Sequence, residues 1–412
     1  MFRSLRNRNY RLFASGQVVS NAGTWMQRVG QDWLVLELSG GSGVALGLTT
    51  ALQFTPMLLF GLWGGVLADR YPKRRLMFIT QSVMGTLALI LAVLTLTGVA
   101  QVWHVCVLAL ALGLASVVDI PARQTFVVEM VGRRDLPNAI ALNSSIFNLA
   151  RVVGPALAGM LIYWLGGTGP VFLLNAGSFA AVLLSLWLIR PAELRTPDPV
   201  PRSKGQLRAG LRYVRDRPDL LMPILLVAFV ATFGMNFSMT TALMAKEVFG
   251  SGADTFGIAS SAFAVGALAG SLLAARRVRP SPRMLIVAAT AFGVLEIVTG
   301  FAPTFWSFLL LLIPTGMALL TVNTAANAIV QLGSAPEMRG RVMGLYVLVF
   351  TGGTPLGSPL VGWVSELFGA RAGVILGGAA SLLGVGIALL LTRMISKRSA
   401  RLPGQEPAPR TA

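Results

Sequence analysis

A stripe of polar side chains runs along the first long apolar stretch of the chain. It consists of Gln17, Asn21, Trp25, Arg28 and Asp32, which are three or four residues apart. A helix would place all of them on one face. Lipid cannot satisfy their donors and acceptors, so this face should meet partner helices or a water-filled cavity. Arg28 and Asp32 lie one turn apart, so they can neutralise each other or can handle a ligand or a proton.

Three more ionisable residues, Asp119, Arg151 and Glu296, fall inside apolar stretches. A charged side chain costs about 2.5–3.5 kcal/mol at a bilayer centre on insertion scales. We expect Asp119 and Arg151 to form an ion pair between neighbouring helices, either structural or able to bind and release a proton. Five asparagines are candidates to line the cavity, and the three of the second half can instead bond neighbouring helices. The five are Asn143, Asn148, Asn236, Asn323 and Asn327.

The composition indicates that most of the chain lies in a membrane. Hydrophobic residues make up 54% of the 412 residues, charged residues only 12%, and the mean hydropathy is +0.70. The net charge of +18 resides in short loops between apolar runs, so we interpret it as an orientation signal and expect no nucleic-acid partner. The single cysteine, Cys106, excludes an internal disulfide.

Apolar runs of about 20 residues, the length that spans a bilayer, occur twelve times. The sequence therefore predicts an all-α polytopic membrane protein with two pseudo-symmetric bundles of six helices. We expect bundles at 1–190 and 220–395, a linker at 191–219 and a disordered tail at 396–412. The predicted spans are 11–37, 44–66, 76–98, 103–124, 139–165, 170–190, 220–243, 257–275, 284–302, 306–331, 343–367 and 372–393.

The distribution of Lys and Arg predicts the orientation of these helices. Nearly all loop cations fall on the side that carries the two termini, whereas the loops of the other side hold only Lys246 and Arg371. Since cation-rich loops stay inside, both termini should be cytoplasmic. No small-residue cleavage site follows the first apolar run, so we expect a retained first helix.

An internal repeat relates the two halves. The segment from Gly154 to Gly159, followed by Gly166, has a counterpart in the segment from Gly357 to Gly362, followed by Gly369. A duplicated six-helix unit is typical of proteins whose two similar bundles tilt about a site held between them.

Two motifs carry a resemblance to a known family. Gly65-x-x-x-Asp69-Arg70-x-Pro72-Lys73-Arg74 resembles the loop between helices 2 and 3 of the major facilitator superfamily, with Pro72 where the family usually has Gly. This resemblance implies a gating loop in which Asp69 helps to hold the two halves together. It also demotes Glu296, because helix 9 is peripheral in the superfamily.

The second motif, Arg151-x-x-Gly154-Pro155-x-x-Ala158-Gly159, resembles the helix-5 signature of antiporters in the superfamily. Its small residues also suit close helix packing alone. The chain as a whole resembles the bacterial branch with the enterobactin exporter and with macrolide or multidrug efflux pumps. A helix-4 arginine associated with proton coupling in drug antiporters is missing from Ala109 to Gly113.

The resemblance implies proton-coupled export of a small, partly apolar compound by a monomer in the bacterial cell membrane. The partners would be the substrate, protons and lipid. Asp119, Asp32, Arg151 and Arg28 are the proton-coupling candidates. Proton-coupled uptake of a metabolite and a transport-inactive sensor or assembly partner are the alternatives. With no Walker A motif and one isolated histidine, His104, the sequence indicates no enzyme, cofactor or metal site.

Overall fold

The computed structural model describes residues 3–194, 206–215, 217–275 and 281–399, and these contain helices but no strand. The all-α fold predicted from the sequence is confirmed. The helices are α1 Arg8–Leu38, α2 Gly43–Arg70, α3 Lys73–Leu96, α4 Val102–Leu165, α5 Gly169–Leu188, α6 Gln206–Arg215, α7 Pro218–Phe229, α8 Phe237–Leu243, α9 Ala253–Ala275, α10 Pro282–Gly300, α11 Phe305–Gly333, α12 Pro336–Phe368 and α13 Ala370–Ser399.

Eleven of the helical segments described are long and apolar enough to cross a membrane. Helix α1 is not among these eleven, because its polar stripe lowers its mean hydropathy. Its 31 residues nevertheless extend over about 46 Å, and it packs along α4 and α5. With α1 as the twelfth, the long helices correspond to the twelve predicted spans.

Helix α4 contains two of the predicted spans and the segment between them. The chain stays helical through this segment except at Gly132, whose φ of 71° and ψ of 176° separate the spans Val102–Gly132 and Arg134–Leu165. The positive φ is one that glycine adopts readily. Phe126 and Met130 are buried in one cluster with Tyr10 and Phe13 of α1, and this packing favours helix on the approach to Gly132.

The seventh span is broken, although the sequence predicts one continuous helix at 220–243. A π-helical turn at Val230–Gly234 follows α7, the chain leaves helical geometry at Met235 and Asn236, and α8 leads into a second π-helical turn at Met244–Val248. Such π-helical turns occur frequently at functional sites. The break lies at the middle of the span, between the two halves of the molecule.

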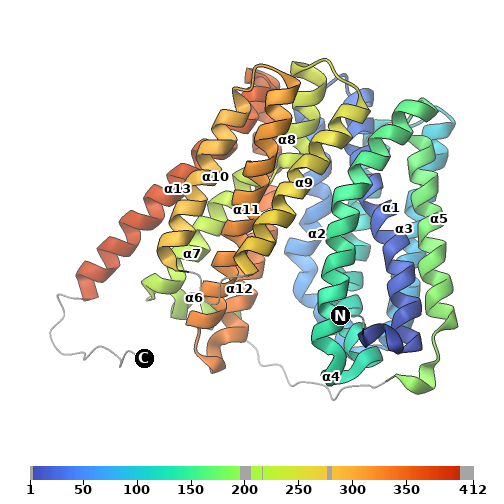
Figure 1. Cartoon of the computed structure of the whole chain (residues 1–412), viewed down its shortest axis with the longest axis horizontal. Helices are drawn as coiled ribbons and strands as arrows, with labels where there is room; N and C mark the ends of the chain where they lie inside the picture. Colours follow the sequence, from blue (N-terminus) through green and yellow to red (C-terminus); the bar gives the residue numbers. More distant parts are fainter. Residues whose placement is uncertain (1–2, 195–205, 216, 276–280, 400–412) are drawn as a thin grey trace.

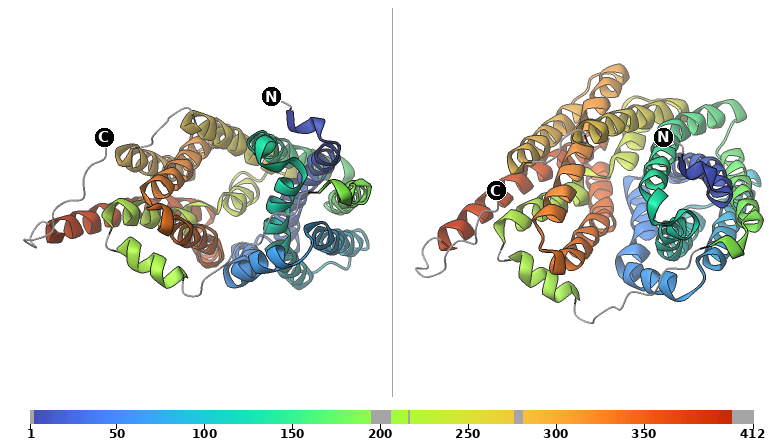
Figure 2. Two further views of the ribbon diagram at one scale, coloured as in Figure 1. Left: turned by 90° about the horizontal axis from the view of Figure 1, so that it is seen from below. Right: turned by 60° about the horizontal axis from the view of Figure 1, so that its bottom comes forward.

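The helices form two groups, α1 to α5 and α6 to α13, which stand side by side (Figures 1 and 2). We call the end of the molecule that carries the cation-rich loops the basic end, at the bottom of Figure 1, and the opposite end the far end. The linker residues 195–205 and the tail residues 400–412 lie outside the described part of the chain. Helix α6 lies within the predicted linker.

Glycines bring the two groups into backbone contact toward the far end. A Cβ atom added to Gly362 of α12 would lie 2.3 Å from the carbonyl oxygen of Gly43 in α2. A Cβ added to Gly159 of α4 would lie 2.5 Å from the carbonyl oxygen of Ala253 in α9. We call these two contacts the glycine seal. Only residues without a side chain allow helices to approach so closely.

The glycine that begins each repeat segment packs within its own group. A Cβ on Gly154 would lie 2.6 Å from Cβ of Trp25 in α1, and a Cβ on Gly357 would lie 1.5 Å from the carbonyl oxygen of Thr232 after α7. In both halves, therefore, the glycine that begins the segment (Gly154 or Gly357) contacts the first span of its own group. The glycine that ends the segment (Gly159 or Gly362) contacts the second span of the other group. These matching contacts support the internal repeat.

Candidate substrate cavity

A cavity of about 430 Å³ lies between the two groups of helices. We call it the central cavity. Its size falls in the range of small-molecule sites. Both groups contribute to its walls, and Arg28, Asp32 and Arg151 are the charged side chains among the residues that line it. The other described lining residues are Trp25, Val29, Thr50, Gln53, Phe54, Phe147, Pro155, Met235, Asn236, Phe237, Ser238, Met239, Thr241, Ser260, Phe263, Ala264, Leu319, Phe350, Thr351 and Thr354.

Two guanidinium groups lie beside the indole ring of Trp25. The Cζ atom of Arg28 is 4.8 Å from the ring centroid and that of Arg151 is 5.6 Å from it. The Arg28 guanidinium also lies 5.6 Å from the ring centroid of Phe54. Cation–π attraction stabilises such positions but leaves the N–H donors available. In the part of the chain that the structure describes, neither guanidinium has a hydrogen-bond or ion-pair partner.

Asp32 joins the two groups at the central cavity. Its carboxylate accepts a hydrogen bond from the Ser238 hydroxyl on α8. Among the ion pairs of the described residues, none links Asp32 to Arg28, so the predicted mutual neutralisation takes the form of two charges near each other without a direct contact. Hydrogen bonding to a carboxylate is stronger than between neutral groups. The contact therefore helps to hold α1 against α8.

The break in the seventh span brings polar and aromatic groups to the cavity wall. The Asn236 side chain donates to the backbone carbonyl oxygens of Thr232 and Phe233. Its own side-chain oxygen is buried and has no partner among the described residues. The next residue, Phe237, stacks on Phe263 with 4.4 Å between the ring centroids.

Several residues predicted to line the cavity have other positions. Gln17 is buried and accepts a hydrogen bond from Arg123 at 3.2 Å, and Asn21 donates to Gln17. Asn143 accepts from the Tyr10 hydroxyl at 2.9 Å. None of these three is among the described residues that line the cavity, and each bonds a neighbour within the first group. Two more lie off the described wall, namely Asn148 and Asn327.

Asn323 lies near the cavity but is not among its described lining residues. Its amide nitrogen contacts the sulfur of Met235 at 3.9 Å, and its backbone carbonyl accepts a hydrogen bond from the Tyr346 hydroxyl at 3.2 Å. Its contacts thus tie α11 to the broken span and to α12. Of the asparagines predicted from the sequence, Asn236 lines the cavity directly.

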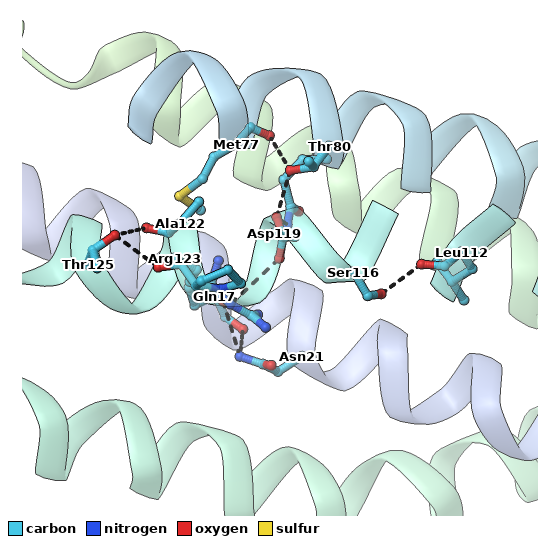
Figure 3. A network of polar contacts seen from close by, with 12 residues as sticks. Gln17, Asn21, Met77, Thr80, Leu112, Ser116, Asp119, Ala122, Arg123 and Thr125 are labelled. Atoms are coloured by element: carbon cyan, nitrogen blue, oxygen red, sulfur yellow. Dashed lines mark hydrogen bonds and ion pairs between the residues drawn. The ribbon is translucent and has the colours of Figure 1, made fainter. Parts of the chain in front are cut away.

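Asp119 is buried between α3 and α4, away from Arg151. Its carboxylate accepts hydrogen bonds from Thr80 and Gln81, each at 2.8 Å, and lies 3.7 Å from the Arg123 guanidinium (Figure 3). The predicted Asp119–Arg151 ion pair is therefore wrong. Asp119 points toward α3, and Arg123 one turn along the same helix is the nearer cation.

The basic loop ties together helices of the first group. The buried Lys73 lies 3.2 Å from the carboxylate of Glu129. Arg74 donates to the carbonyl oxygens of Leu186 and Trp187 at the end of α5, where a cation also complements the helix dipole. Two further residues of the predicted gating loop, Asp69 and Arg70, are exposed, and Gly65 is half-buried.

The helix-5 motif lies beside the cavity and at the glycine seal. Pro155 lines the cavity, and its carbonyl oxygen would be 2.4 Å from a Cβ on Gly257 of α9. Gly154 and Gly159 make the two close contacts described above. The motif therefore closes the molecule toward the far end.

Polar contacts reinforce this closure. The Ser42 hydroxyl and the Val44 amide donate to the Glu366 carboxylate at 2.6 and 2.9 Å. Lys246 donates to the carbonyl oxygen of Leu36 at 2.6 Å. These bonds join the first group to the second.

Glu296 of α10 is buried, and one of its carboxylate oxygens has no hydrogen-bond partner among the described residues. Its other oxygen packs so closely on Gly377 of α13 that a Cβ there would lie 2.3 Å away. The residue does not line the central cavity.

The cavity wall also contains residues that the sequence reasoning missed. Gln53 is uncharged and lies in an apolar run, yet its side-chain oxygen Oε1 accepts a hydrogen bond from the side-chain amide of Gln31 at 3.0 Å. Ser238 and Phe237 gain their positions from the break in the seventh span. A polar residue within an apolar run was the feature that could have indicated these positions. The residue type alone does not show whether such a side chain lines the cavity or contacts a neighbouring helix.

A family model described as transmembrane secretion effector matches residues 1–410. The chain belongs to this family of major facilitator transporters. It is 28% identical over 372 residues to the multidrug efflux pump Tap of Mycolicibacterium fortuitum, with 88% of this chain and 90% of that protein covered. It is 25% identical over 360 residues to the staphyloferrin A transporter of Staphylococcus aureus, with 87% and 89% covered.

The transporter also resembles solved structures. A bacterial homologue of the human lysosomal transporter Spinster, inward-facing and unoccupied, superposes with a TM-score of 0.76 at 15% identity, covering 96% of this chain and 98% of that one. The POT family transporter PepTSo superposes with a TM-score of 0.73 at 12% identity, covering 95% and 99%. At these identities the likeness shows the major facilitator fold. The fold and family predicted from the sequence are thus confirmed, and the transporter is not an enzyme.

Proposed function

We propose that the transporter exports a small, partly apolar compound in exchange for protons. The observation that carries the proposal is the central cavity, where both groups of helices surround charged and aromatic side chains. A site held between two bundles is reached from one side and then the other as the bundles tilt. Relatives over most of the chain include a multidrug efflux pump, the staphyloferrin A transporter and, at 22% identity, macrolide efflux protein A of Streptococcus pyogenes.

In the proposed orientation the basic end is cytoplasmic and the transporter lies in the cell membrane of a bacterium as a monomer. The glycine seal and the hydrogen bonds of Glu366 and Lys246 then close the outer side. The described state would accept its substrate from the cytoplasm, as an exporter does at the start of its cycle. The exposed Asp69 would make its predicted contact between halves when the basic end closes.

For proton coupling we propose Asp32 in place of Asp119. The Ser238–Asp32 hydrogen bond crosses between the groups, and it is strongest when the carboxylate is ionised. A proton on Asp32 would weaken this contact, so proton binding and release at Asp32 would be linked to the movement of the two groups. Arg28 and Arg151 would sense that proton through their shared cavity. Asp119, bound by Thr80, Gln81 and Arg123, would serve mainly to join α3 to α4.

An efflux assay tests the proposal. The transporter is expressed in drug-hypersensitive bacteria, and the accumulation of a panel of compounds is measured with and without a protonophore. We expect lower accumulation of at least one compound, and we expect the protonophore and Asp32→Asn each to abolish the difference. Glu193→Gln, which neutralises an exposed carboxylate beyond α5, is the matched control and should export normally.

Two results would contradict export. Gradient-driven accumulation of a compound would favour the alternative of uptake by symport. Compound binding without any gradient-dependent flux would favour the transport-inactive sensor.

A further inference from the structure

The charged side chains of the central cavity do not balance. Arg28 and Arg151 contribute two positive charges and Asp32 contributes one negative charge when ionised, so the described lining carries a net charge of +1. A net charge enclosed between helices is costly, because little water remains to solvate it. A bound anion would bring the cavity to neutrality.

The available hydrogen-bond donors point the same way. The Asp32 carboxylate accepts from Ser238. Both guanidinium groups retain their N–H donors, since their described contacts are with aromatic ring faces. Guanidinium binds carboxylates and similar oxyanions with two parallel hydrogen bonds. Trp25 lies beside both groups and holds them toward the same part of the cavity.

The rest of the wall suits an apolar partner. Aromatic rings surround the arginines and continue onto the opposite group of helices, where Phe237 stacks on Phe263. Phe147 meets Trp25 edge to face, with 5.6 Å between the ring centroids. Such surfaces bind flat or aliphatic parts of a ligand.

We propose that the central cavity selects an amphipathic organic anion, with its acidic group bound by Arg28 and Arg151 and its apolar part packed on the aromatic wall. The inference rests on the proposed function insofar as it assigns the substrate to this cavity. It adds the chemical class of the substrate. Cationic and neutral compounds of the same shape are disfavoured.

Binding to the purified full-length transporter in lipid nanodiscs tests the charge preference. Three fluorescent probes each carry a dansyl group and differ in charge. Dansylglycine is the anion, dansylamide the neutral compound and dansylcadaverine the cation. We expect dansylglycine to bind at least about tenfold more tightly than the other two, because charge-assisted bonds to arginine are the difference between the probes. Equal affinities, a preference for the cation, or no binding above empty nanodiscs would each overturn the proposal.

Variants locate the anion site. Arg28→Gln and Arg151→Gln should each weaken dansylglycine binding about tenfold while dansylamide binding stays unchanged, which also shows that the cavity is intact. Arg75→Gln, which removes an exposed cation of the basic loop, should change neither affinity. A loss of dansylglycine binding matched by dansylamide, or no loss in either arginine variant, would contradict the assignment. The three-probe comparison on the unmodified transporter needs no variant to fold.

These measurements use no ion gradient, so they separate the inference from the proposed function. An anion preference without gradient-dependent flux would leave the inference standing and remove export. Protonophore-sensitive export of a cation, with dansylglycine failing to bind, would support export and overturn the inference.

Discussion

The ammonium group of Lys73 and the carboxylate of Glu129 form a buried ion pair, 3.2 Å apart, that links the start of α3 to α4. Lys73→Gln would leave Glu129 buried without its counter-charge, which costs about 3–5 kcal/mol. We expect a lower midpoint of thermal unfolding in detergent for this variant. Arg75→Gln, which changes an exposed cation two residues along, should have little effect.

The double variant Lys73→Met/Glu129→Leu provides the cross-check. Replacing both charges by apolar groups removes the unpaired carboxylate, so stability should return close to that of the parent. If Lys73→Gln unfolds at the parent temperature, the ion pair does not stabilise the fold.

The glycine seal predicts a shift in conformation. A Cβ on Gly362 would lie 2.3 Å from the Gly43 carbonyl oxygen, so Gly362→Ala should push α12 away from α2 and favour opening at the far end. The readout is maleimide labelling of Ser358→Cys, a buried position beside Gly47, in a Cys106→Ser background. We expect labelling to become several-fold faster.

Gly386→Ala is the matched control for this experiment. A Cβ at Gly386 meets no atom within 4 Å, so the same chemical change should leave the labelling rate unaltered. Equal rates in the two glycine variants would show that the contact does not hold the closed state.

The surroundings of Asp119 predict a structural role. Asp119→Asn should lower the stability of the folded transporter by about 1–3 kcal/mol, because an amide cannot satisfy Thr80, Gln81 and Arg123 together. Thr80→Val, which removes one of these donors, should cost about 1 kcal/mol. Proton-driven flux per folded molecule should persist in both variants, and its loss in Asp119→Asn alone would return the coupling role to this residue.

The Asp32→Asn variant should affect substrate binding and proton coupling in opposite ways. Its negative charge opposes an anion in the same cavity, so Asp32→Asn should bind dansylglycine several-fold more tightly than the parent does. The same variant should lose the dependence of flux on the proton gradient, since the ionised partner of Ser238 is gone. Parallel flux of anion and proton in one direction would favour the symport alternative.

A proton bound to Asp32 would by the same reasoning strengthen anion binding. Exchange in opposite directions therefore cannot arise from competition for the arginines. It would require the contact between Asp32 and Ser238 to control which end opens. Measuring dansylglycine affinity between pH 5 and pH 8 in the parent and in Asp32→Asn tests this. Affinity should rise at low pH in the parent alone.

The sequence predicted the broad architecture well because apolar length and loop charge are strong local signals. The spans, the repeat glycines and the basic loop all follow from them. The polar stripe of α1 was also informative, although its members divide between two environments. Trp25, Arg28 and Asp32 face the central cavity, whereas Gln17 lies in the Asp119 network toward the basic end.

The partners of buried charges were beyond such reasoning. Depth along a helix made Arg151 a plausible partner for Asp119, but the direction of the side chain decides the contact, and Asp119 points to α3. Thr80 and Gln81 formed the overlooked signal, as two adjacent polar residues in an apolar run. The break after α7 escaped prediction because Met235 and Asn236 give no local reason to leave a helix, so packing around them determines the backbone.

The glycine seal is made by main-chain atoms that have neither a titratable proton nor a rotamer to change. The stability of this contact should therefore depend little on pH or salt concentration, because it rests on the fit of two backbones alone. The glycine seal therefore closes the far end without responding to protons or ions itself. A change in protonation or in ion binding could open the far end only through the few side chains that cross between the two groups beside the seal.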